Sequence, residues 1–501
     1  MDFLDPQKQR ANMIRMIVGY ILIGIAILFA TLILLYQAYG FGIDRDGEVI
    51  QNGLVFMSSQ PDNAQIFLDG KLYKSNTNAR LQLEAGQYTA KIQKEGYRPW
   101  QRILSVDGGS VRHYDYPLLI PSKLTTANLK SYNTAPGFAS QSPDRRWLVV
   151  QQNTSPLNFD LYDLSDPLEV TARLKTFSLP DAVLTSPSAG EHSLQLIEWS
   201  TDNRHILVKH VVGETNEYIT VDTREPTLSL NLTRALSLTP TKVLTLHDKK
   251  FDKFYVYDST ARTLDTTTVS NAGKTSPLLD QIISYKTYGS DIVLYITDKA
   301  APAGKVMAAL MDGSETYKIR DLVPTGPYLI DISQYDRKWY VAVGASSENR
   351  VYVYQNPQQV RRSSVTAALV PVQVLKVATP NYLAFSSNTE FIATQNGTNF
   401  ADYDAETDKG YNFISKYPLD PPAVHGTWMD GHRLSYVSGG KLVIFDYDNI
   451  NAQAIVPASP NYLAMFNRNY GYVYTFVSSV NADGQPATTL TGTSLRIPAD
   501  Q

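Results

Sequence analysis

The stretch from Met16 to Tyr36 constrains this chain most, because it is apolar and carries no charge. A helix of about twenty residues rises far enough to cross a hydrocarbon layer of roughly 30 Å. We therefore expect a retained membrane anchor. The alternative is a cleaved signal peptide, whose apolar region is shorter, about 7 to 15 residues, and for which the small-residue motif Ala38–Gly40 offers a poor cleavage site.

The charges around this stretch predict its orientation. Lys8, Arg10 and Arg15 precede it, whereas only Arg45 follows closely. Positive charge resists translocation, so the N-terminus is expected in the cytoplasm. The predicted organisation is a cytoplasmic tail (1–15), a transmembrane helix (16–39), a linker (40–52), a small β-sandwich (53–120) and a large β-domain (124–501).

Composition restricts the cellular compartments and the binding partners that this chain can have. The chain has no cysteine, which excludes disulfides, thiolate chemistry and cysteine-ligated zinc, and which favours a bacterial envelope over a secretory pathway. The formal charge of -3 gives no basic footprint for nucleic acid. A hydrophobic content of 43% is ample for packed cores, so the long segment beyond the span is expected to fold.

Residues 53–120 alternate in hydrophobicity between turn signals, which predicts a small antiparallel sandwich. The turns are placed at Pro61–Asn63, Asp69–Gly70, Gly86 and Gly96.

The order of these residues resembles the PEGA domain, a small β-sandwich of bacterial and archaeal surface proteins. The resemblance is carried by Ser59, Pro61, Ala64, Ile66, Leu68, Asp69, Gly70, Gly86, Gly96 and Tyr97. Two positions depart from the family pattern: the namesake tetrapeptide reads ProAspAsnAla, and Lys74–Ala79 replaces the usual GlyxThrPro step. Asn63 tolerates the positive φ of the missing glycine, so the fold is expected to survive. The resemblance implies a spacer or interaction module without catalytic residues.

From Leu124 onward the chain repeats one unit: an apolar strand, a polar tight turn, a second strand and a third strand. The first strands start near Phe138, Ile197, Ile330, Leu383, Gly426 and Leu463. The third strands end at Asp163, Asp222, Asp258, Asp312, Gln355, Asp404 and Asp446, which recur every 36 to 59 residues. A four-stranded propeller blade takes about 40 to 50 residues. The repeat therefore predicts a β-propeller.

Eight blades are favoured, and seven remain open because the strand pair in Thr241–Asp258 is short. The turns resemble those of β-propellers of the TolB type, which implies a scaffold and a protein-binding role rather than a reaction. The strand-like segments Leu124–Tyr132 and Leu490–Ile497 have no partner in the repeat. We predict that they meet in one blade and close the ring.

The acidic residues that could bind a metal ion are better explained by local structure. The aspartates at strand ends match Asx turns, which accept hydrogen bonds from the next backbone N–H groups. The segment Asp402–Gly410 spaces its oxygens like a calcium loop, but Thr407 stands where glycine is needed and no glutamate closes the loop. The acidic group of Asp446, Asp448 and Asn451 is a weaker match still.

Histidine and glycine motifs also fail to form recognised sites. None of the seven histidines lies in a HisGluxxHis motif, and His205 and His210 are expected on opposite faces of one strand. Gly273–Thr275 lacks the upstream glycine of a phosphate loop, where Thr268 stands. We expect no metal, no cofactor and no catalytic residue that the sequence can name. An active site assembled from several blade loops remains open.

Two AsnTyrLeuAla repeats provide the candidate binding residues Asn381, Tyr382, Asn461 and Tyr462, each just before the first strand of a blade. Tyrosine makes large amphipathic contacts at low entropic cost. The repeats fit either a binding face or duplicated core packing.

The sequence as a whole predicts a single-pass protein of the bacterial cytoplasmic membrane with extracytoplasmic domains. Its expected role is an interaction scaffold that binds other envelope proteins or cell-wall polymer. The alternative is a propeller enzyme acting on envelope glycans or peptides.

Overall fold

The computed structural model describes residues 6–38, 41–43, 49–185, 192–213, 215–271, 274–364, 367–422, 425–481 and 484–500. Parts of the predicted tail and linker, and Gly273 of the glycine motif, lie outside the described residues. The described chain divides between Lys123 and Leu124 into two compact units.

The first unit begins with helix α1, Pro6–Ala38. Within it, Asn12–Tyr36 form a stretch of 25 residues with a mean hydropathy of 2.8, none of it buried against protein. In the described part of the chain this is the one helix long and apolar enough to cross a membrane. A helix satisfies its own backbone hydrogen bonds, which is what a hydrocarbon layer requires.

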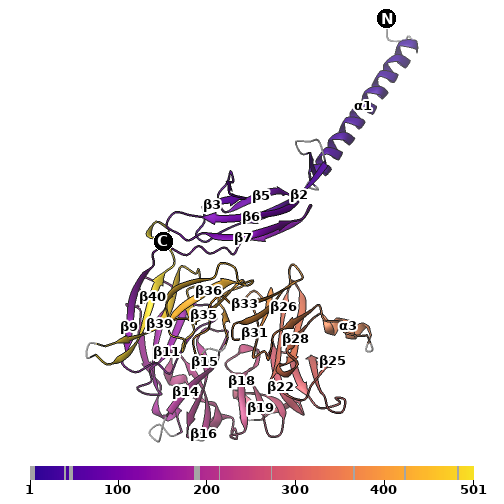
Figure 1. The fold of residues 1–501 in the computed structure, drawn as a ribbon. Helices are drawn as coiled ribbons and strands as arrows, with labels where there is room; N and C mark the ends of the chain where they lie inside the picture. The colour runs from indigo at the N-terminus through magenta and orange to yellow at the C-terminus, as the bar shows by residue number, and fades with distance from the viewer. Residues whose placement is uncertain are drawn as a thin grey trace. The chain divides into compact units, whose positions relative to one another are not determined.

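The rest of the first unit is a sandwich of two four-stranded sheets, ordered β4-β3-β6-β7 and β1-β2-β5 with β8 also beside β2 (Figure 1). The strands are β1 (Phe41–Ile43), β2 (Val49–Met57), β3 (Gln65–Leu68), β4 (Lys71–Leu72), β5 (Ala79–Glu84), β6 (Gly86–Gln93), β7 (Trp100–Val106) and β8 (Val111–Tyr114). Trp100, Ile66 and Leu81 are among the buried core residues. The turns follow the prediction, since Asn63, Asp69 and Gly70 all have positive φ (57°, 48° and 77°).

The expectation of a purely antiparallel sandwich is wrong at one strand, because β8 pairs with β2 in parallel. The chain leaves β7 in one sheet and joins β2 in the other, so it crosses between the layers at residues 107–110. Gly53 of β2 lies against this crossing: a Cβ there would stand 2.4 Å from Val106 Cγ1 and 2.7 Å from the Asp107 carbonyl oxygen. A side chain at position 53 would therefore push the crossing away.

Among the described residues, the second unit contains eight four-stranded antiparallel sheets, which confirms the propeller and the favoured blade number. Blades one to four comprise β10 (Phe138–Gln141), β11 (Trp147–Gln151), β12 (Asn158–Asp163) and β13 (Lys175–Ser178); β14 (His192–Trp199), β15 (His205–Val212), β16 (Thr215–Asp222) and β17 (Leu230–Asn231); β18 (Lys242–Leu246), β19 (Lys253–Asp258), β20 (Thr263–Thr268) and β21 (Ser276–Leu279); and β22 (Ile282–Tyr288), β23 (Ile292–Thr297), β24 (Val306–Asp312) and β25 (Glu315–Leu322).

Blades five to eight comprise β26 (Tyr328–Tyr335), β27 (Lys338–Ala345), β28 (Arg350–Gln355) and β29 (Gln373–Lys376); β30 (Tyr382–Phe385), β31 (Phe391–Asn396), β32 (Asn399–Asp404) and β33 (Lys409–Ile414); β34 (Thr427–Trp428), β35 (Arg433–Ser438), β36 (Lys441–Asp446) and β37 (Gln453–Pro457); and β38 (Met465–Phe466), β39 (Tyr472–Val480), β40 (Pro486–Ser494) and β9 (Thr125–Tyr132). Helices α2 (Leu232–Ala235) and α3 (Pro357–Ser363) and the 3-10 turns η1 (Asp181–Val183) and η2 (Pro226–Leu228) lie between strands.

The first strand of each blade is the innermost, because first strands of neighbouring blades contact one another, as β22 does β26 and β26 does β30. The core lies between the blades. Between blades one and two, for example, Val149, Phe159 and Leu161 pack with Ile206, Val208 and Ile219. Each blade thus buries both faces against its neighbours.

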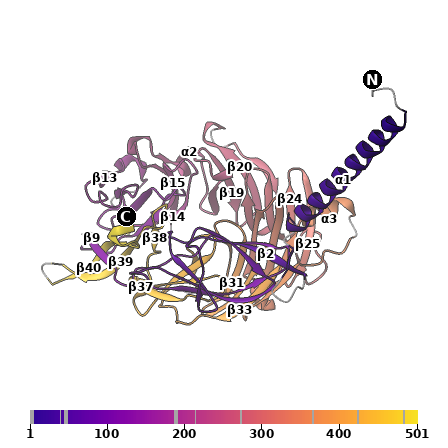
Figure 2. The same cartoon turned by 90° about the horizontal axis from the view of Figure 1, so that it is seen from above.

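The predicted closure is confirmed: β9 pairs with β40 in blade eight, and the two lie side by side in both views (Figures 1 and 2). The C-terminal strand begins at Pro486, earlier than expected. Side chains of β9 also reach blade one, where Lys130 Nζ and the Tyr132 hydroxyl donate to Asp160 Oδ2 at 2.6 and 2.7 Å. The N-terminal strand of the propeller therefore joins its last blade to its first.

Candidate functional site

Four of the strand-end aspartates, Asp163, Asp222, Asp258 and Asp404, stabilise turns as predicted. Asp222 Oδ1 accepts from the backbone N–H groups of Arg224 and Glu225 at 2.9 and 3.0 Å. Asp258 Oδ1 does the same with Thr260 and Ala261, and Asp404 Oδ1 with Glu406 and Thr407. These carboxylates therefore already accept hydrogen bonds from backbone groups of their own blades.

Arginines reinforce two of these turns. Arg146 binds Asp163, and Arg204 binds Asp222, each through two nitrogens. Burial alone would raise the pKa of both carboxyls, but the arginine and backbone hydrogen bonds hold each at about 2.

The calcium-like segment does not assemble a metal site. Asp402 is fully buried on β32, and neither of its carboxyl oxygens has a hydrogen-bond partner. Asp404 belongs to the Asx turn, and Asp408 accepts from the Tyr403 hydroxyl at 2.8 Å. Across the described ranges, no group of three or more His, Asp or Glu side chains is arranged to hold a metal ion.

The two predicted binding tyrosines are half-buried rather than exposed. The Tyr382 ring lies 3.9 Å from that of His425, and burial raises the pKa of its hydroxyl to about 12, with a further contribution from Asp331. Tyr462 packs against Phe476 and donates to the Pro136 carbonyl at 2.7 Å. Asn381 and Asn461 are exposed. The structure does not bring the two AsnTyr pairs into one contact, and their binding role stays a prediction.

A buried polar cluster in blade two was not foreseen. Strands β14, β15 and β16 place His192, His210 and Glu217 on one face of the blade, and His210 lies directly opposite Glu217 in the β15–β16 register. His210 is fully buried and Glu217 nearly so. Thr185, which precedes β14, and Asn231 of β17 complete the cluster.

The cluster forms a chain of short hydrogen bonds. His192 Nδ1 lies 2.9 Å from His210 Nε2, and His210 Nδ1 lies 2.8 Å from Glu217 Oε1. Glu217 Oε2 accepts from the Thr185 hydroxyl and from Asn231 Nδ2, both at 2.6 Å. Burial alone would raise the pKa of Glu217, but the bonds from Thr185, His210 and Asn231 lower it. Glu217 is therefore an ionised carboxylate at neutral pH.

Chemically, this chain is a carboxylate, an imidazole and a second imidazole in series. A carboxylate that orients one histidine, which in turn orients a second group, is the order found in general-base relays. In the His192–His210 contact one ring nitrogen donates and the other accepts, so the two imidazoles are coupled through one hydrogen bond.

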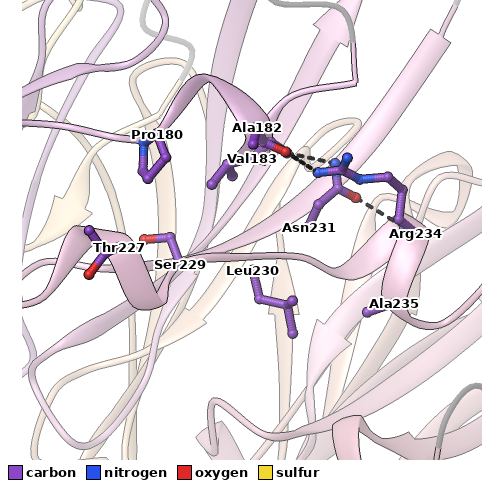
Figure 3. Close-up of a pocket in the computed structure, with 9 residues that line it drawn as sticks. All are labelled: Pro180, Ala182, Val183, Thr227, Ser229, Leu230, Asn231, Arg234 and Ala235. Atoms are coloured by element: carbon purple, nitrogen blue, oxygen red, sulfur yellow. Dashed lines mark hydrogen bonds between the residues drawn. The ribbon is translucent and has the colours of Figure 1, made fainter.

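Two hollows flank the cluster. One, of about 260 Å³, is lined by polar residues that include Thr185, His210, Glu217 and Thr233. The other, of about 500 Å³, lies between η1 and α2 (Figure 3). Its lining comprises Pro180, Ala182, Val183, Thr227, Ser229, Leu230, Asn231, Arg234 and Ala235.

Part of this cluster was open to sequence reasoning. A hairpin turning at Gly213 sets His210 opposite Glu217, and that pair follows from the strand pattern alone. The expected separation of His205 from His210 is confirmed, because His205 contacts Asp202 and Asp222 instead. No local signal points to Thr185 or Asn231, which come from the loop before β14 and from the outer strand.

Comparison with known proteins identifies one part of the chain. The PEGA domain model matches residues 52–119, which confirms the resemblance drawn from the turn residues. No curated protein matches the sequence.

Solved structures that resemble the chain include three enzymes. A dihydro-heme d1 dehydrogenase NirN in complex with DHE is 14% identical, with a TM-score of 0.42 over 64% of this chain and 66% of its own. An oligogalacturonate lyase in complex with manganese is 10% identical, with a TM-score of 0.40 over 75% and 99%. Porphyromonas gingivalis dipeptidyl peptidase 4 is 12% identical, with a TM-score of 0.42 over 73% and 58%. At this identity the likeness says nothing about activity.

Proposed function

We propose that this chain is a membrane-anchored interaction protein that presents a PEGA domain and an eight-bladed propeller for protein or envelope-polymer binding. The observation that carries the proposal is the apolar helix Asn12–Tyr36, which is not buried against any of the residues that the structure describes, on the same chain as two β-modules. An uncovered helix of this length has a natural place in a bilayer. The modules then have a fixed place at a membrane surface.

The polar groups of the propeller support binding rather than a reaction. Asp222, Asp258 and Asp404 accept hydrogen bonds from their own turns. The Glu217 carboxylate already accepts hydrogen bonds from three residues. The exposed Asn381 and Asn461, each next to a half-buried tyrosine, remain our candidates for part of a binding face. Envelope proteins or cell-wall polymer are the proposed partners, and the proposed location is the outer side of a bacterial cytoplasmic membrane.

Two experiments test this proposal. Protease added to intact spheroplasts is expected to remove the sandwich and the propeller, because both lie outside. A chain left whole beside a digested external control protein would overturn the placement. Crosslinking in the native envelope is expected to capture protein or polymer partners on the propeller, whereas a propeller that crosslinks to nothing would count against the interaction role.

A second candidate function is an envelope enzyme acting on glycans or peptides, and the Glu217–His210–His192 chain is the observation that favours it. In that case His192 is the general base. Cell-wall glycan and peptide substrates incubated with the purified chain would then be cleaved at a rate that falls on changing His192→Gln. Equal rates for both forms, or no cleavage, would discard this candidate.

A further inference from the structure

Two histidine rings meet at the start of blade two. His192 Nδ1 lies 2.9 Å from His210 Nε2, and the rings are nearly parallel, with their centroids 5.1 Å apart. On the other side of the buried ring, His210 Nδ1 lies 2.8 Å from Glu217 Oε1. Because Glu217 is ionised at neutral pH, His210 Nδ1 carries a proton and donates to this carboxylate.

The contact between the two rings has room for one proton between the facing nitrogens. With both rings neutral, His192 Nδ1–H donates to His210 Nε2, and with His210 charged the direction of the bond reverses. If both rings were charged, two N–H groups and two positive charges would face each other across 2.9 Å. Neither nitrogen could then accept, so the contact would have to open.

The other charged groups near the pair do not relieve this repulsion. Of the described residues, Glu217 of β16 is the one carboxylate in contact with the pair, and it touches His210. Lys209, the neighbour of His210 on β15, lies on the opposite face of the strand. Asp181 of η1 is exposed, and the Arg234 guanidinium of α2, bonded to backbone carbonyls of η1, adds a further positive charge.

The start of β14 can move without the rest of the blade. A register shift between Leu196 and Glu198 interrupts the pairing of β14 with β15. Beyond this shift Trp199 is fixed to blade one, because its Nε1 donates to a serine hydroxyl there at 3.0 Å. The segment His192–Leu196 is therefore bounded by a bulge, and the ring of His192 helps to hold it against β15.

We propose that the His192–His210 pair is an acid-sensitive switch that releases the segment His192–Leu196 from β15. At neutral pH one hydrogen bond joins the two rings and the segment stays paired. In acid both rings take up a proton, the contact opens and the start of β14 leaves β15. The smaller hollow changes as well, because His210 and Val212 line its wall. The inference concerns regulation within blade two and holds whichever partner the propeller binds.

The size of the response follows from counting protons. An ordinary histidine titrates at about pH 6.5, so two free rings take up two protons in acid. The closed pair takes up one at most, and the open form therefore binds one proton more than the closed form below about pH 6. The ratio of open to closed molecules then rises up to about tenfold for each pH unit.

Hydrogen–deuterium exchange of the full chain in detergent micelles measures this ratio. After correction for the intrinsic exchange rate, peptides that cover His192–Leu196 are expected to lose protection by up to about tenfold per pH unit between about pH 6 and 5. The β39–β40 hairpin provides an internal control, because its strands contain no His, Asp or Glu, and its protection should stay the same. This comparison needs no variant.

His192→Gln separates the titration from the packing. A glutamine amide can donate to a neutral His210 and accept from a charged one, so the contact is kept in acid. Protection of the segment in this variant is expected to stay the same down to about pH 5, where an ordinary histidine is charged. Equal melting temperatures at neutral pH would show that the variant folds.

His205→Gln is the matched control. His205 lies on β15 as well, but it contacts Asp202 and Asp222 and not the histidine pair, so this variant should keep the acid response. Wild-type protection of the segment that does not change with pH would overturn the switch, and so would an equal loss in acid in His192→Gln.

Discussion

Changing Asp402→Asn is expected to stabilise the propeller at neutral pH, although it removes a carboxyl group. Asp402 is fully buried, and no donor reaches either carboxyl oxygen. Asp160 of blade one is equally buried but accepts hydrogen bonds from Lys130, Tyr132, Gln152 and Thr176. Burial, with the nearby charge of Asp448 as a smaller cause, raises the pKa of Asp402 well above its ordinary value of 3.8.

The size of the effect follows from that pKa. In the unfolded chain Asp402 ionises near its ordinary value, whereas in the folded chain it stays protonated to higher pH. Each pH unit above the ordinary value lowers the free energy of unfolding by about 1.4 kcal/mol, until the folded-state pKa is passed. At pH 7 the upper limit is about 4 kcal/mol. Asparagine has no such cost, although it also leaves buried polar atoms without partners, so we expect a gain of roughly 1 to 4 kcal/mol.

Thermal unfolding of the full chain in micelles measures this gain. For the roughly 380 residues of the propeller, an unfolding entropy of about 2.1 cal/mol/K per residue converts the gain into about 1 to 5 °C. The gain should shrink towards zero as the pH falls below the ordinary value of 3.8, because Asp402 is then neutral in both states. Asp336→Asn, at an exposed turn, is the control and should change little. A variant less stable than wild type at pH 7, or a gain that does not vary with pH, would refute the reasoning.

Three further predictions follow from the fold. Deleting the residues after Thr489 removes half of β40 and its pairing with β9, so the melting temperature of the propeller should fall by many degrees; an unchanged melt would show that this pairing does not close the ring. Asp222→Asn should lower the free energy of unfolding by about 1 to 3 kcal/mol at pH 7, because the folded chain holds the pKa of Asp222 at about 2. The stability that the Asp222 carboxylate contributes is fully present above its ordinary pKa of 3.8 and is lost as the pH falls through about 2. Urea titrations at pH 7 and at about pH 2 measure the difference, and a loss that grows on acidification would contradict the assignment. Tyr462→Phe removes the hydroxyl that donates to the Pro136 carbonyl and should cost about 1 kcal/mol, whereas an unchanged urea midpoint would show that this bond adds nothing.

Much of the fold was open to prediction because it is encoded locally. The long apolar helix follows from an uncharged run of residues, and the turns at Asn63 and Asp69–Gly70 follow from residue types that tolerate positive φ. The blade count follows from a period that each hairpin repeats. The parallel pairing of β8 with β2 did not follow, since it depends on where the chain crosses between two sheets.

The candidate site was predictable only in part, for a similar reason. His210 and Glu217 belong to one hairpin, so their pairing can be predicted from the local sequence around Gly213. Asn231 and Thr185, which both donate to Glu217, reach the same cluster from separate segments.

The sequence by itself thus determined the membrane-length helix, the strand period and the turns, because each depends on residues close together in the chain. Only the tertiary structure decided that Asp402 lacks a partner while Asp160 has four, and that His192 meets His210 on one face of blade two. The burial and the hydrogen-bond partners of a residue depend on which side chains of other strands and blades pack against it. The local pattern of alternating strands does not predict that packing.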